Sequence, residues 1–174
     1  MIPIFIERMG LALPPTVETA AELAKKIGRS EDWIKRRAGV HERRISELSM
    51  PELAAKAGLD ALGDGPLPDL ILNASGVAHQ VLPDTSVFIQ EAMGFSGIPS
   101  FSVHATCLSF LTALQTASGL LNTGSYQRIL VISADLGSRG RNFDEAESAA
   151  LLGDGAAAAA VSYTHLTLPT NREV

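Results

Sequence analysis

Two uninterrupted apolar runs constrain the fold of this chain more strongly than any other feature. Residues 70–72 read Leu-Ile-Leu and residues 129–132 read Ile-Leu-Val-Ile, without a polar side chain in either run. A strand of this composition is typical of a sheet that is covered on both faces. Segments with the three- or four-residue apolar spacing of helices lie between the runs, so we expect an α/β layered fold with mainly parallel pairing.

The apolar spacing changes near the single cysteine. Phe101 and Val103 alternate with polar neighbours, as in a strand, whereas from Leu108 to Leu121 the apolar residues recur every three or four positions, as in a helix. Cys107 is therefore expected where a strand turns into a helix. Unpaired N–H groups and the positive end of the helix dipole at such a junction favour a thiolate and can hold an oxyanion. The alternative is a small buried residue that only packs.

Capping patterns predict several helix starts. Four residues can accept a hydrogen bond from the first turn of a helix, and two of them have a glutamate three positions later, which completes a capping box. These four residues are Thr19, Ser30, Ser49 and Asp84. A first strand is predicted over residues 2–6, and the glycine and prolines of residues 10–15 are expected to end it.

Composition and charge exclude several classes of function. With 174 residues, 46% of them hydrophobic, the chain is long enough for one compact domain. A net charge of −5 with interspersed charges leaves no basic stripe for nucleic acid. No run is long enough for a membrane span, and residues 2–6 are too short for a signal peptide. A single cysteine forms no internal disulfide, which favours a reducing, cytoplasmic location.

The stretch 98–124 resembles the active-site segment of β-ketoacyl-acyl-carrier-protein synthase III, a thiolase-fold condensing enzyme in which a nucleophilic cysteine opens a buried helix. The resemblance implies an α/β, thiolase-like fold of which the chain supplies one half, a mixed, mainly parallel five-stranded sheet with helices on both faces. Residues 1–162 are expected to be the N-terminal half of such an enzyme. Residues 163–174 continue no periodicity, and we expect them to be a non-native tail.

The segment 30–45 is similar to a second signature of the same family. An acidic pair precedes Trp-Ile, and an arginine, a Gly-Val pair and a Glu-Arg pair follow. The resemblance implies that Trp33 and Arg37 hold the adenine and phosphate end of coenzyme A, by stacking on the indole and by charge pairing. From the residues alone, the segment is a helix with a solvated basic end and a half-buried Trp33.

The Gly-Asp-Gly of residues 153–155 precedes five alanines, which by propensity favour a helix. It resembles the family's sharp turn into the last strand of its N-terminal half, so we predict a strand. The chain also departs from the family here, because Ala146-Glu147 replace an Arg-Gly pair that flanks the coenzyme. Leu152 replaces an aromatic pocket residue, and Leu82 replaces an aromatic residue before a proline. Both leucines predict a wider acyl tunnel.

The resemblance implies a two-stage acyl transfer in the synthesis of fatty acids or of related lipids and polyketides. Cys107 takes the acyl group from an acyl-CoA, and malonyl-acyl carrier protein then loses carbon dioxide and accepts that group, giving a 3-ketoacyl product. These two thioesters are the substrates, and no cofactor or metal is expected. The histidine and asparagine that assist decarboxylation match no residue here, neither His79 nor His165, so the chain alone is expected at most to acylate itself.

The family also implies a homodimer in which a strand near the cysteine, here residues 100–104, pairs across the two-fold axis. Two other functions remain open. One is a related acyltransferase that passes the acyl group from Cys107 to an oxygen or nitrogen acceptor without decarboxylation. The other is a non-catalytic α/β fragment whose cysteine only packs. In either case, half of a fold leaves apolar helix surface uncovered, so self-association is expected.

Overall fold

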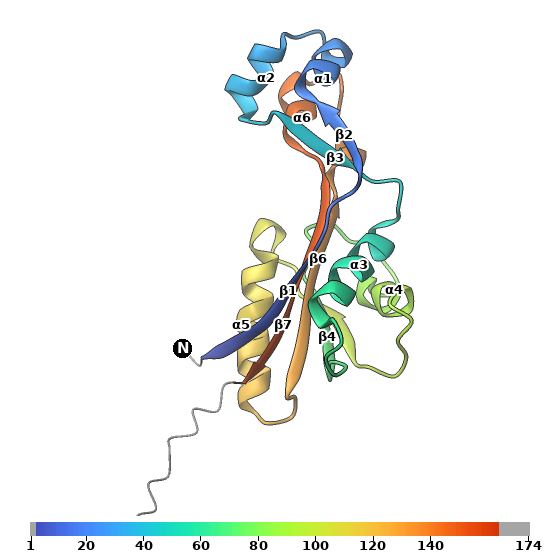
Figure 1. The fold of residues 1–174 in the computed structure, drawn as a ribbon, viewed down its shortest axis with the longest axis vertical. Coiled ribbons are helices and arrows are strands. Elements are labelled where there is room, and N and C mark those ends of the chain that lie inside the picture. The colour runs from blue at the N-terminus through green and yellow to red at the C-terminus, as the bar shows by residue number, and fades with distance from the viewer. Residues whose placement is uncertain (1–2, 164–174) are drawn as a thin grey trace, which may run out of the picture.

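The computed structural model describes residues 3–163, and a five-stranded sheet runs through their centre (Figure 1). Its strands are β1 (Ile4–Ala12), β4 (Leu70–Asn73), β5 (Ser100–Ser102), β6 (Arg128–Leu136) and β7 (Asp154–Tyr163). They lie in the order β1-β7-β6-β4-β5. Strand β4 is parallel to β5 and β6, whereas β7 is antiparallel to β6 and β1. The predicted mixed five-stranded sheet is confirmed. Two of its four pairings are parallel and two are antiparallel, because β7 runs against the other four strands.

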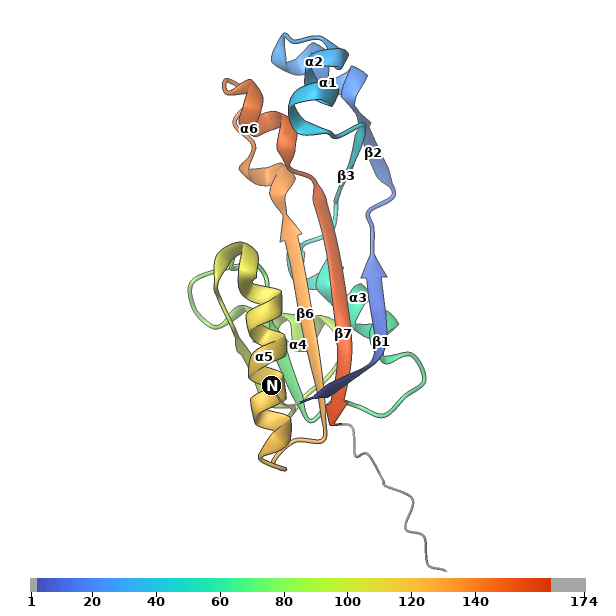
Figure 2. The ribbon, with the colours of Figure 1, turned by 90° about the vertical axis from the view of Figure 1, so that its left-hand side faces the viewer.

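Helices cover both faces of the sheet, as the two apolar runs predict. They are α3 (Met50–Leu62) and α4 (Thr85–Ala92) on one face and α5 (Ser109–Asn122) on the other (Figure 2). In β4, Ile71 belongs to the core cluster of α3 and α4, while Leu70 and Leu72 belong to that of α5. Alternate side chains of a strand point to opposite faces, so a strand covered on both sides is apolar at every position.

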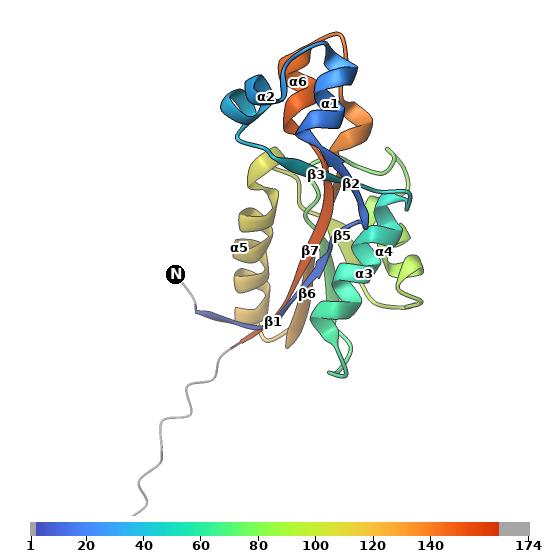
Figure 3. The same ribbon diagram turned by 45° about the horizontal axis from the view of Figure 1, so that its top comes forward.

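A smaller group of elements lies at the end of the sheet that is uppermost in Figures 1 and 3. It consists of β2 (Thr16–Thr19), α1 (Ala20–Ile27), α2 (Glu31–Ala38), β3 (Glu42–Ile45) and α6 (Ala146–Leu151). Leu23, Ile34 and Ala150 form its core. Strands β2 and β3 pair antiparallel. Residues 42–45 were expected to belong to the solvated basic end of a helix. They form a strand instead, because they pair with β2. No local pattern indicated this pairing, since β2 is distant in sequence.

All four predicted N-caps are confirmed. Thr19 and Ser49 complete capping boxes with Glu22 and Glu52, and Ser30 and Asp84 accept hydrogen bonds from the first turns of α2 and α4. Each cap satisfies a backbone N–H that has no partner within its own helix. These helix starts are local features, which explains why the sequence alone predicts them.

Strand β1 is longer than predicted and runs through Gly10, which was expected to break it. The prediction was wrong because this glycine serves packing and not a turn. A Cβ atom at Gly10 would lie 2.1 Å from the carbonyl oxygen of Ala57 and 2.3 Å from the nitrogen of Ala61, both in α3. The helix therefore lies directly on the strand at this position.

The alanine-rich segment forms the interior strand β7, as predicted against its helix propensity. It pairs with β6 on one side and β1 on the other, and Ala158, Ala159 and Ala160 are fully buried. Two rows of sheet hydrogen bonds outweigh the small propensity difference. The strand continues through Tyr163, the first residue of the expected tail. The rest of that tail, including His165, lies outside the described residues.

Between residues 3 and 163, no helix has the length and apolar character needed to cross a membrane.

Candidate active site

Cys107 lies in a single 3₁₀ turn, Thr106–Leu108, between β5 and α5. The predicted junction is confirmed, although α5 itself begins only at Ser109. Thr106 has a φ of 51°, a left-handed conformation that is unfavourable for a β-branched residue. The Ser109 hydroxyl holds the turn: its Oγ accepts from the Ala105 N–H at 2.9 Å and donates to the Thr106 carbonyl at 2.7 Å. The strained turn leaves the Cys107 side chain exposed.

The backbone N–H of Cys107 has no hydrogen-bond acceptor among residues 3–163. The next two N–H groups are used, because Leu108 donates to Ala105 and Ser109 donates to Thr106. An unpaired donor beside a nucleophile is what an oxyanion site requires. The thiol of the same residue is exposed in the described chain, so the unpaired N–H and the thiol face accessible space together.

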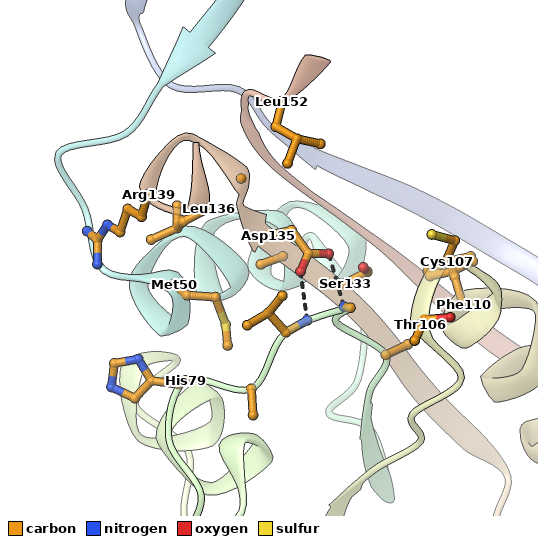
Figure 4. Close-up of a pocket in the computed structure, with 17 residues that line it drawn as sticks. Met50, His79, Thr106, Cys107, Phe110, Ser133, Asp135, Leu136, Arg139 and Leu152 are labelled. Carbon is orange, nitrogen blue, oxygen red and sulfur yellow. Dashed lines mark hydrogen bonds between the residues drawn. The ribbon is translucent and has the colours of Figure 1, made fainter. Parts of the chain in front are cut away.

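A pocket of about 660 Å³ opens beside the cysteine. Its walls come from the cysteine turn and the start of α5, from the loop of residues 74–79 after β4, and from the end of β6 with the turn that follows (Figure 4). Its labelled lining residues are Met50, His79, Thr106, Cys107, Phe110, Ser133, Asp135, Leu136, Arg139 and Leu152. The lining is mostly apolar, as suits an acyl chain.

Asp135 also lines the pocket, and the sequence did not predict a carboxylate there. One carboxylate oxygen accepts from the Gly76 N–H at 3.1 Å and the other from the Val77 N–H at 3.0 Å (Figure 4). The available signal was a carboxylate three residues after the apolar run 129–132. The carboxylate therefore connects the end of β6 to the loop after β4.

His79 lies at the end of the pocket opposite Cys107 (Figure 4). Its backbone N–H donates to Thr85 Oγ1 at 2.9 Å, and its ring meets Phe88 edge-on with a centroid separation of 5.2 Å. No described residue forms a hydrogen bond to the thiol of Cys107. The geometry therefore gives His79 no role as a base for the cysteine.

The two leucines predicted to widen the acyl tunnel are placed differently. Leu152 lines the pocket together with Cys107. Leu82 is 83% exposed and does not line it in this single chain. The structure thus brings one of the two predicted acyl-site residues to the cysteine.

Trp33 and Arg37 lie on α2, outside the lining of the cysteine pocket. Trp33 is half-buried against the α1-α2-α6 core, and the Arg29 guanidinium lies 5.6 Å from the centre of its ring. Lys35 and Arg36 form ion pairs with acidic residues one helical turn earlier. Arg37 is exposed and has no ion pair or hydrogen bond among the described residues, so its charge is available. Helix α6 packs against α2 and leads directly to Leu152.

An ion cluster that the sequence did not predict lies in the same group of elements. Glu18 is buried, and it pairs with Lys26 at 2.5 Å and with Arg141. Burial alone would raise the pKa of Glu18, but hydrogen bonds and charge attraction from Arg141 and Lys26 together hold this pKa below its usual value. Buried Arg43 donates to the Ala150 carbonyl and so ties β3 to α6.

The sheet order and the two helical layers are those of one half of a thiolase-like fold. The solved 3-oxoacyl-[acyl-carrier-protein] synthase III of Aquifex aeolicus superposes with a TM-score of 0.88 and 30% sequence identity, over 94% of this chain and 55% of that protein. The model of the family 3-oxoacyl-[acyl-carrier-protein (ACP)] synthase III matches residues 101–170.

Curated relatives named beta-ketoacyl-[acyl-carrier-protein] synthase III give the same result. The protein of Erythrobacter litoralis is 39% identical over 166 residues, which cover 91% of this chain and 51% of that protein. The protein of Laribacter hongkongensis is 36% identical over 155 residues, which cover 86% of this chain and 49% of that protein. The chain belongs to the 3-oxoacyl-[acyl-carrier-protein] synthase III family, and it spans about half the length of the relatives it matches.

Proposed function

We propose that this chain carries the acyl-accepting half of a condensing enzyme, with Cys107 as the nucleophile. The observation that carries the proposal is the cysteine turn: an exposed thiol, an unpaired backbone N–H on the same residue, and an adjoining apolar pocket. A nucleophile, an oxyanion donor and room for an acyl chain are the three components that formation of a thioester intermediate needs.

In the first stage, Sγ of Cys107 attacks the carbonyl carbon of an acyl-CoA as the thiolate. The carbonyl oxygen becomes an oxyanion and accepts a hydrogen bond from the Cys107 N–H. Collapse of this intermediate breaks the bond to the coenzyme sulfur, which leaves as a thiolate and takes up a proton from water. The product is an S-acyl Cys107 and free coenzyme A.

In the second stage of the whole enzyme, malonyl-acyl carrier protein loses carbon dioxide, and its carbanion attacks the acyl group on Cys107. The histidine and asparagine that assist this step in the family match no residue of this chain. We therefore expect the 174 residues alone to stop at the acylated cysteine. A transferase that uses an oxygen or nitrogen acceptor shares the first stage, so the same acylation precedes either outcome.

We propose the exposed side of α2 as the site for the coenzyme end of the donor. Arg37 offers an unpaired positive charge one helical turn after Trp33, whose ring is half-buried and held in place by the helical core. Both features suit a nucleotide with phosphates. The exposed Glu147 on α6 stands where the family has Arg-Gly, and it weakens the attraction for phosphate.

We propose a homodimer formed through β5. This strand lies at one edge of the sheet, so its outer side is unpaired in the described chain, and Phe101 on it is 40% exposed. An open edge strand is a template for pairing with a second copy. In that dimer the exposed Leu82 would be available to the partner's acyl pocket. The proposal includes acyl carrier protein as the second partner and the cytoplasm as the location.

The proposal is tested by the intact mass of the full chain after incubation with acetyl-, butyryl- or octanoyl-CoA. We expect one acyl adduct per chain on the wild type and none on Cys107→Ala, because this is the only cysteine. The pocket with Leu152 predicts that the longer donors react at least as well as acetyl-CoA. An unchanged mass with all three donors would contradict acylation by the chain alone and favour a non-catalytic fragment.

A further inference from the structure

The loop of residues 74–79 is fixed to β6 at several points. The Ala74 N–H donates to the Ile132 carbonyl at 2.6 Å, and the Ala134 N–H donates to Ser75 Oγ at 3.0 Å. At the far end, the His79 N–H bonds to Thr85. Between these anchors, the Gly76 and Val77 N–H groups each donate to Asp135. No other hydrogen bond from an N–H group of residues 76–78 is formed among the described residues.

The contact between Asp135 and the loop is close as well as polar. A Cβ atom at Gly76 would lie 3.4 Å from Oδ1 and 3.5 Å from Oδ2 of Asp135, so the loop backbone rests directly on the carboxylate. The two consecutive N–H groups bond to different oxygens of the carboxylate, so this arrangement uses both oxygens as acceptors. The side chain of Val77 is 71% exposed and contributes little packing that could replace these bonds.

The same loop residues form one wall of the acyl pocket. Gly76, Val77 and Ala78 line it together with Thr106, Cys107 and Phe110 of the cysteine turn and α5. Asp135, which holds the loop, is labelled in Figure 4. The distance between the loop and the cysteine turn depends on where the loop is held. We propose that Asp135 is a positioning residue that holds the 76–78 segment as a fixed wall of the pocket and thereby limits the length of the acyl chain that reaches Cys107.

This inference rests on the proposed acyl site, but its first test does not need any acyl transfer. Hydrogen exchange of the Gly76 and Val77 amides measures the two bonds directly. In Asp135→Ala we expect both amides to exchange about ten- to a hundredfold faster than in the wild type. In Asp135→Asn, whose amide offers one acceptor oxygen and faces the other N–H with a donor, we expect a smaller increase. Unchanged exchange in Asp135→Ala would overturn the inference.

The second test measures the pocket with methyl-, butyl- and octyl-methanethiosulfonate. The Cys107 thiolate attacks the reagent's alkylthio sulfur, an Sγ–S bond forms, and methanesulfinate leaves. We expect both Asp135 variants to raise the octyl-to-methyl rate ratio, by about tenfold in Asp135→Ala. A merely destabilised chain would change all three rates together, so an unchanged ratio would overturn the inference.

Asp64→Asn is the matched control, because Asp64 is an exposed turn carboxylate without a hydrogen bond among the described residues. It is expected to leave both the exchange rates and the rate ratio unchanged. Far-ultraviolet circular dichroism checks the fold of each variant, and loss of folding in both Asp135 variants would assign the residue to the fold and overturn the positioning role. If the chain does not react with acyl-CoA but the Asp135 variants still change the octyl-to-methyl rate ratio, only the proposed function is rejected.

Discussion

At the scale of single residues, buried carboxylates join segments that are far apart in the chain. Asp154, in the Gly-Asp-Gly turn, accepts from the Ser46 N–H at 2.7 Å, the Ser138 N–H at 2.8 Å and the Ser138 hydroxyl at 2.7 Å. It is buried and connects the segment after β3, the turn after β6 and the start of β7. These hydrogen bonds explain the aspartate of the Gly-Asp-Gly turn without a bound ligand.

Asp154→Asn is expected to destabilise the protein by about 2–4 kcal/mol, because the amide group places a donor against at least one buried donor. The free energy of unfolding in urea measures this loss. Asp144→Asn, at an exposed position without a bonded carboxylate, should stay within about 0.5 kcal/mol of the wild type. Equal stability of the two variants would contradict the structural role of Asp154.

The Glu18 cluster predicts a pH dependence of stability. The pKa of Glu18 is lower in the folded chain than its ordinary value of 4.5, so the unfolded state binds a proton more readily and acid favours unfolding. The stabilisation is present above about pH 4.5 and is lost as the pH falls through the folded pKa. Glu18→Gln should be less stable than the wild type at pH 7, with a difference that shrinks below about pH 4.5 in urea titrations. A difference that stays constant down to pH 3 would contradict this.

At the scale of elements, close contact between α3 and β1 depends on Gly10, which has no side chain. The backbone of Gly10 in β1 lies against Ala57 and Ala61 of α3. Small residues on both elements let a helix approach a strand more closely than larger side chains would allow. The alanines of β7 serve the same purpose in the same core cluster, where Ala156, Ala158 and Ala160 face α3.

Gly10→Ala is expected to cost about 2–4 kcal/mol, since the added methyl group would overlap backbone atoms that cannot move without shifting α3. Gly119→Ala is the matched control. It lies in the last turn of α5 with no atom within 4 Å of its added Cβ, so it should stabilise the protein by up to about 0.5–1 kcal/mol. Urea unfolding should show a lower free energy of unfolding for Gly10→Ala and a higher one for Gly119→Ala. A small effect at Gly10 would contradict the packing described.

At the scale of the whole molecule, large apolar side chains remain uncovered on two elements. On β1, Phe5, Met9 and Leu11 are each more than half exposed. At the cysteine turn Leu108 is 57% exposed, and on α5 Leu111 is 62% exposed. Monomeric soluble proteins rarely leave such residues clustered on a surface. The chain spans about half the length of its relatives, and these faces fit its expected self-association.

We expect the chain to self-associate at micromolar concentrations, and Leu111→Gln to weaken that association by removing apolar surface from α5. Sedimentation velocity over a range of concentrations measures the change. Gln115→Ala, at an exposed polar position of the same helix, is the control that should associate like the wild type. A monomeric wild type would contradict the expectation.

The sequence by itself determined the elements whose signals are local. The four N-caps, the doubly covered strand β4 and the strand-to-helix junction at Cys107 depend on residues within a few positions of one another. Such patterns act through backbone hydrogen bonds and alternating burial, which short segments already specify. The family resemblance placed these elements in one fold.

Only the tertiary structure decided the features that depend on distant partners. The alanines of β7 are a strand because β1 and β6 pair with them, and residues 42–45 are a strand because β2 does. The pocket is likewise assembled from segments that are separate in sequence, and the place of Asp135 in its wall follows from the parallel pairing of β4 and β6. Contacts of this kind form only when the sheet brings the segments together, and no local pattern specifies them.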